Sequence, residues 1–68
     1  MVITGPERAR LNTAIAAAQH DAQRSLDCAL AVLRDPSPET IGAAHRAAAD
    51  ARIALADLVD LLIHAETR

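Results

Sequence analysis

The stretch RDPSPET, residues 34–40, decides how this chain folds. Pro36 and Pro38 cannot both lie inside one helix, because each removes a backbone donor and clashes with the preceding turn. Pro36 also disfavours helical backbone at Asp35, so a helix that reaches this point has to end. Ser37 is typical of an N-cap, and Pro38 suits the first position of a new helix. The stretch therefore predicts the end of one helix and the start of the next.

The segments on both sides of this turn have the composition of long helices. The first begins at Thr4, which forms a capping-box pattern with Glu7 three residues later. Both are rich in Ala, Leu and Arg, which favour helix, and neither alternates with the period of two that a strand shows. We expect an all-α fold with helices over about residues 6–34 and 38–66, in one domain spanning residues 1–68. The short turn makes the pair an antiparallel hairpin.

Apolar residues recur every three or four positions along each segment, so each helix has a stripe that can face the other. The stripe of the first segment contains Leu11, Ile15, Ala18, Ala22, Leu26, Ala29 and Leu33. The stripe of the second segment contains Ile41, Ala44, Ala48, Ala51, Leu55, Leu58 and Leu62. We expect these stripes to form the seam of the hairpin, with small residues meeting near its middle.

The second segment carries more apolar surface than one facing helix can cover. Leu61, Ala47, Ala54 and Ala65 lie on one side of its stripe, and further apolar residues lie on the other. A chain of 68 residues has a small core and usually needs a disulfide, a structural metal or oligomerisation to be stable. Its one cysteine cannot form an internal disulfide. We therefore expect a homodimer that forms a four-helix bundle, or binding to another protein. The residues predicted at this interface are Ile41, His45, Arg52, Val59, Ile63, Leu30 and Val32.

Two polar residues, His45 and Arg52, lie seven positions apart on this otherwise apolar flank. We interpret them as the edge of the interface, where Arg52 extends over alanines and pairs with an acid such as Asp21 or Asp27. Such a pair fixes register and partner choice more than it adds stability. An anion or partner-peptide site is the alternative interpretation.

Asp60 and His64 are weak candidates for metal ligands. Their spacing of four residues can place two ligands on one ion. However, the Glu-x-x-His motif of di-iron bundles is absent, and both residues point away from the predicted core. A solvated helix face, with a histidine that suits the end of the helix, is the preferred interpretation, and we expect no cofactor. Cys28 is interpreted as a small, half-buried hydrophobe, with a redox-sensitive or intermolecular thiol as the alternative.

Composition argues against several classes of function. Ser25 and Cys28 have no histidine at a spacing that makes a catalytic constellation, and a hairpin has no deep pocket, so we do not expect an enzyme. The net charge of −2 and the absence of aromatic residues do not favour nucleic-acid binding. The first residues do not resemble a signal peptide, and no apolar run approaches the ~20 residues of a membrane span, so we expect a cytoplasmic protein.

The sequence therefore predicts a small, alanine-rich interaction or regulatory module that acts as a homodimeric helical hairpin. Two alternatives stay open. One is a metal- or anion-binding bundle that uses Asp60 with His64, or His45 with Arg52. The other is a small nucleic-acid-binding regulator, because a dimer could gather Arg8 and Arg10 at one end of the bundle.

Overall fold

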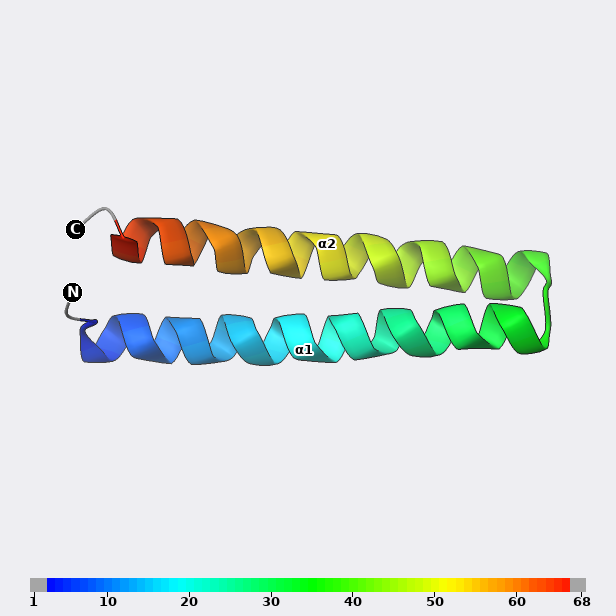
Figure 1. The fold of residues 1–68 in the computed structure, drawn as a ribbon, viewed down its shortest axis with the longest axis horizontal. Coiled ribbons are helices and arrows are strands. Elements are labelled where there is room, and N and C mark those ends of the chain that lie inside the picture. Colours follow the sequence, from blue (N-terminus) through cyan, green and yellow to red (C-terminus); the bar gives the residue numbers. More distant parts are fainter. Residues whose placement is uncertain (1–2, 67–68) are drawn as a thin grey trace.

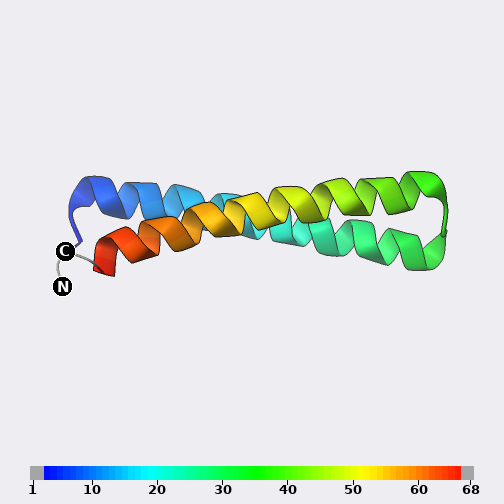
Figure 2. The same cartoon turned by 90° about the horizontal axis from the view of Figure 1, so that it is seen from above.

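The computed structural model of the chain describes residues 3–66, which form two long helices packed side by side. Helix α1 spans Gly5–Arg34 and helix α2 spans Pro38–Glu66. They run antiparallel, cross at a shallow angle, and bring the two ends of the chain to the same end of the molecule (Figures 1 and 2). The hairpin measures 48 × 16 × 13 Å. The predicted all-α hairpin is confirmed, and α1 begins one residue earlier than expected.

The start of α1 is fixed by the predicted capping box. The Glu7 backbone N–H donates to the Thr4 hydroxyl at 3.3 Å, and the Thr4 backbone N–H donates to Glu7 Oε1 at 3.2 Å. Two backbone donors that the helix cannot satisfy internally are thereby paired. The sequence pattern therefore predicted the local structure correctly.

The turn between the helices is held by a second, similar exchange. Ser37 caps α2, because its hydroxyl accepts from the Thr40 backbone N–H at 3.2 Å, while the Ser37 backbone N–H donates to Thr40 Oγ1 at 3.0 Å. The Thr40 hydroxyl also donates to the Asp35 carbonyl at 2.8 Å. This hydrogen bond joins the residue directly after α1 to the first helical turn of α2. The connection is therefore short and closed, and it forces the helices to lie antiparallel.

The seam between the helices is made mainly of alanine. Among the residues that the structure describes, five side chains are buried and all five are alanines: Ala18, Ala47, Ala51, Ala54 and Ala65. On each helix, one series of buried and half-buried positions repeats in alternating steps of three and four, as expected of two helices that wind around each other. On α1 this series is Leu11, Ala14, Ala18, Asp21, Ser25, Cys28 and Val32. On α2 it is Ala44, Ala47, Ala51, Ala54, Leu58, Leu61 and Ala65.

The predicted seam was right at Leu11 and Leu58 but wrong at its other six large residues. Leu26 and Leu33 of α1 are 61% and 79% exposed, and Leu55 and Leu62 of α2 are both 48% exposed. On α2 the observed seam is rotated by about 50° from the prediction, toward Ala47 and its neighbours. Alanines on facing helices allow the backbones to approach closely, whereas leucines at the same positions would hold them apart. The hairpin thus fully buries alanines among its described residues, half-buries Leu11, Leu58 and Leu61, and leaves most of its other large residues exposed.

Candidate interaction surface

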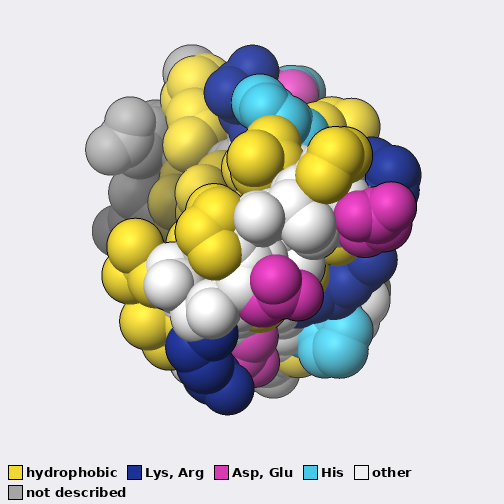
Figure 3. All heavy atoms as spheres, turned by 90° about the vertical axis from the view of Figure 1, so that its right-hand side faces the viewer, with side chains coloured by type: hydrophobic (Ala, Val, Ile, Leu, Met, Phe, Trp, Pro, Cys, Tyr) yellow, Lys and Arg dark blue, Asp and Glu magenta, His cyan; other side chains and the backbone are white. Residues whose placement is uncertain are grey.

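Two long faces flank the alanine seam, and their residue types are opposite. We call the first the apolar face. It consists of the positions that lie beside the seam on one side of the hairpin: Ile15, Ala22, Ala29, Ile41, Ala48, Leu55 and Leu62. Three further residues lie at its edges: Leu26, Leu33 and Val59. We call the second the charged face, and it consists of Arg10, Ala17, Arg24, Asp50, Asp57 and His64. Viewed from the turn end, hydrophobic side chains gather on one flank across both helices, and acidic side chains lie on the opposite flank (Figure 3).

The large side chains of the apolar face are open to solvent in the single hairpin. All seven of its leucine, isoleucine and valine residues are between 42% and 79% exposed. The accessible surface of the hairpin is 5095 Å², whereas a compact monomer of this mass exposes about 4,100 Å². Monomeric proteins rarely expose a contiguous apolar patch larger than a few hundred square ångströms. The single hairpin therefore exposes large aliphatic side chains of both helices on this face.

The apolar face is hollowed near the turn. A hollow of about 360 Å³ lies between α1 and α2 there. Its floor is made by small residues, Ala29, Ala44 and Ala48, and its rim includes Ile41 and His45. Because alanine side chains stop at Cβ, the two helices leave room here that neither of them fills.

The charged face carries an ion pair that links the two helices. Arg24 Nη1 lies 3.2 Å from Asp50 Oδ2, and both side chains are about half exposed. Exposed pairs of this kind contribute about 0.2–1 kcal/mol to stability, so this contact adds little to the free energy that holds the two helices together. A wide hollow beside it is bordered by Asp21, Asp50 and Asp57. Carboxylates and this ion pair keep this face hydrated.

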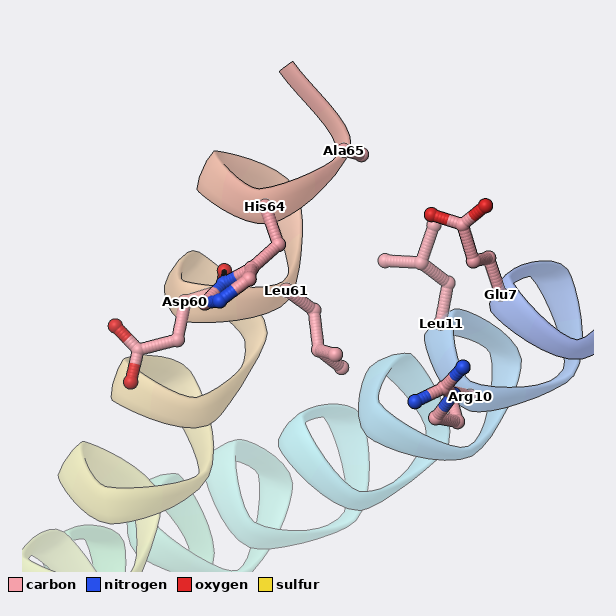
Figure 4. Close-up of a pocket in the computed structure, with 7 residues that line it drawn as sticks. All are labelled: Glu7, Arg10, Leu11, Asp60, Leu61, His64 and Ala65. Carbon is pink, nitrogen blue, oxygen red and sulfur yellow. Dashed lines mark hydrogen bonds between the residues drawn. The ribbon is translucent and has the colours of Figure 1, made fainter. Parts of the chain in front are cut away.

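The weak metal candidates Asp60 and His64 border a third hollow, of about 250 Å³, at the end where the chain begins and ends. Glu7 and Arg10 face them from α1 (Figure 4). A ring nitrogen of His64, Nδ1, lies 2.9 Å from the backbone carbonyl oxygen of Asp60. The Asp60 carboxylate points away from the ring, so the two side chains do not converge on one point (Figure 4). Over the described part of the chain, no three His, Cys, Asp or Glu side chains form a group that could hold a metal ion.

The predicted interface residues fall in three places. Ile41 and Val59 lie on the apolar face, as expected, and His45 lines its hollow. Leu30 and Ile63 are half exposed on the outer sides of α1 and α2, directed away from the opposite helix. Their position separates them from the apolar face.

The other two predicted residues, Val32 and Arg52, behave differently from each other. Val32 is half-buried in the seam, and its side chain also lines the hollow near the turn. Arg52 is exposed at the edge of the apolar face. Within one hairpin, among the described residues, it forms no ion pair with Asp21 or Asp27. Asp27 instead accepts from Gln23 Nε2 at 3.0 Å, and Asp21 borders the hollow on the charged face.

The sequence interpretation missed the most prominent residues of the apolar face. Ile15, Leu55 and Leu62 were assigned to the seam of the hairpin, whereas they lie outside it. The run of alanines at 44, 47, 51 and 54 was the available signal, because it repeats in steps of three and four as strictly as the leucine stripe does. Hydrophobicity alone favoured the leucines, but close packing of helices favours the smaller side chains.

Neither helix, over the residues that the structure describes, contains a stretch long and apolar enough to cross a membrane. The fold defines the class of protein only as a two-helix antiparallel hairpin with an alanine seam. Comparisons of the chain with protein-family models, curated proteins and solved structures find no significant match.

Proposed function

We propose that this protein is a small non-catalytic interaction module of the cytoplasm that works as a homodimer. Two hairpins pair through their apolar faces and form a four-helix bundle, which presents its outer helix surfaces to a protein partner. The observation that supports this proposal is the exposure of the leucine, isoleucine and valine side chains of one face, beside a seam that buries only alanines.

The size of the apolar face fits a dimer. The hairpin is 48 Å long and 16 Å wide, and one side of it therefore offers roughly the 800 Å² per partner that a stable protein interface buries. Aliphatic side chains gain free energy when they leave water, at about 25 cal/mol for each square ångström of apolar surface. A second copy supplies an apolar surface of the same dimensions, and a two-fold axis lets each copy cover the other.

The outer sides of the bundle are the surfaces that remain for a partner. Leu30 and Ile63 point away from the opposite helix of their own hairpin, so pairing through the apolar faces leaves them at the surface of the bundle. Exposed aliphatic residues on a helix are typical contacts for helix-to-helix recognition. We assign these two residues to binding of a regulatory or structural protein partner.

The proposal is tested by the mass of the protein in solution. Light scattering with refractive-index detection suits a chain without Trp or Tyr, and we expect twice the monomer mass of 7.2 kDa. Replacing both Val59→Asp and Leu62→Asp places charges in the interface, so the variant should have the mass of one chain. A matched control carries Leu30→Asp and Ile53→Asp, which change the charge equally but lie off the apolar face, and it should stay dimeric. A wild-type chain that remains a helical monomer at high concentration contradicts the proposal.

A further inference from the structure

Two basic residues, His45 and Arg52, interrupt an otherwise apolar stripe of α2. The stripe consists of Ile41, His45, Ala48, Arg52, Leu55, Val59 and Leu62, and its steps alternate between four and three residues. Such a repeat places all of them on one side of the helix, toward the second layer of the proposed bundle. We propose that His45 makes the dimer sensitive to pH, so that protonation of its imidazole separates the two hairpins. The proposal rests on the proposed homodimer.

No acidic residue lies in this stripe or in the corresponding stripe of α1. The α1 stripe consists of Ile15, Gln19, Ala22, Leu26, Ala29 and Leu33. Near the middle of the hairpin, the carboxylates of Asp21, Asp50 and Asp57 border the hollow on the charged face instead. In the two stripes, over residues 15–33 and 41–62, the ionisable side chains are therefore His45 and Arg52, and both are basic.

The single hairpin gives His45 no counter-charge. Its side chain is exposed and lines the hollow near the turn together with Ser25 and Ala29 of α1. Within the described part of the chain, His45 has no hydrogen-bond or ion-pair partner. The ring is therefore held only by contacts with uncharged neighbours and by water.

The other ionisable groups around His45 do not supply a carboxylate to it. On α2 its charged neighbours are the cations Arg46 and Arg52, while Glu39 lies about 9 Å farther along the axis and on another side of the helix. On α1, beside His45, Asp27 accepts from Gln23 Nε2 on the outer side of the helix. Cys28 of α1 lies in the seam.

A second copy of the chain brings no counter-charge either. Because it offers the same two stripes, it adds another His45 and another Arg52 and no carboxylate, whichever way round the two hairpins lie. A neutral imidazole is covered by aliphatic side chains at small cost, whereas an imidazolium loses its hydration and gains no acid in exchange. The charged ring is better solvated in the separate hairpin, so binding of the proton favours dissociation.

The direction of this effect distinguishes it from the general charge of the chain. Histidine changes its charge between about pH 8 and pH 5, so the dimer should be tightest at the upper end of that range. The net charge moves from −2 with neutral histidines to +1 with all three protonated. Repulsion between two whole chains therefore falls on acidification. A dimer that weakens on acidification has to contain a local charge in its interface.

Sedimentation equilibrium with interference optics tests the proposal by giving the dimer dissociation constant at about pH 8 and about pH 5.5. We expect the constant to be about tenfold or more higher at the lower pH, because two imidazolium rings enter each interface. His45→Gln cannot be protonated and should remove most of this difference. His20→Gln is the matched control, because His20 is exposed outside both stripes, and it should retain the difference.

The same measurements separate failure of the pH dependence from failure of the dimer. A wild-type constant that is equal at the two pH values, or lower at the acidic one, overturns the proposal and leaves the dimer intact. A difference that His45→Gln retains belongs to another group and also overturns it. A wild-type chain that is monomeric at both pH values contradicts the homodimer itself, and with it the proposed function.

Discussion

The two faces of this hairpin flank the same alanine-rich seam, yet one carries charged side chains and the other carries exposed aliphatic ones. The charged face has its own contact between helices, the ion pair of Arg24 with Asp50, and its carboxylates keep it hydrated. The apolar face has aliphatic side chains of both helices that are exposed in the single hairpin. The difference shows that the residues beside the seam give the two sides of one hairpin opposite chemistry, and the proposed dimer uses the apolar side.

The seam sets this difference because its side chains are so small. Ala47 and Ala51 bring the backbones of α1 and α2 close together near the middle of the hairpin, where little space remains for a leucine. The leucines of the seam, Leu11, Leu58 and Leu61, lie toward one end, and the other large residues occupy positions beside or away from the seam. On one side those positions are occupied by Leu55 and Leu62, and on the other by Asp50 and Asp57.

The largest effect is expected where two similar residues lie on opposite sides of α2. Leu55 on the apolar face and Ile53 toward the charged side are 48% and 63% exposed in the single hairpin. Leu55→Ala should weaken the dimer by about 1.5–3 kcal/mol for each copy, because a buried aliphatic side chain is lost. Ile53→Ala should leave the dimer unchanged. Sedimentation equilibrium measures the dissociation constants of both variants. Equal effects of the two changes would contradict the prediction that only the apolar face lies in the dimer interface.

An intermediate effect is expected when the seam itself is widened. Ala47 is 1% exposed, so Ala47→Leu should force the helices apart and destabilise the hairpin by about 1–3 kcal/mol. Ala49→Leu adds the same atoms on the outer side of α2 and should change the free energy of unfolding little. Urea unfolding followed by circular dichroism, at one fixed protein concentration, compares the two. Unchanged stability of Ala47→Leu would show that the helices do not depend on close approach.

The smallest effect is expected on the charged face. Arg24 and Asp50 are about half exposed, so the coupling energy between them should be only about 0.2–1 kcal/mol and should decrease as salt is added. A double-mutant cycle with Arg24→Ala and Asp50→Ala, measured by thermal unfolding at low and high ionic strength, gives this energy. A coupling above that range, independent of salt, would mean that the charged face contributes to holding the hairpin as the seam does.

Local signals in the sequence predicted most of the fold. Thr4 with Glu7 and Ser37 with Pro38 marked the starts of the helices, and Pro36 marked the end of the first, because caps and prolines act on their immediate neighbours. The composition of the two segments and the shortness of the turn then implied an antiparallel pair. Those features depend on residues within a few positions of one another, so the sequence alone is sufficient for them.

The division between seam and exposed positions was predicted only in part. Val59 is exposed, as predicted, whereas Ile15, Leu55 and Leu62 were assigned to the seam and are exposed, and Val32 was assigned to the interface although it lies in the seam. Along α2 the leucine stripe and the alanine stripe have the same periodicity and differ by about 50° in direction. Periodicity therefore could not decide between them.

The sequence by itself determined that this chain forms two capped helices joined by a closed turn, and that its apolar surface exceeds what one hairpin can bury. The tertiary structure decided which apolar residues are buried. That choice depends on how closely two backbones approach, which is a property of both helices together. Alanine at the contact allows the closest approach and the densest packing, so alanines are the residues that the seam buries fully, while Leu55 and Leu62 are exposed beside it.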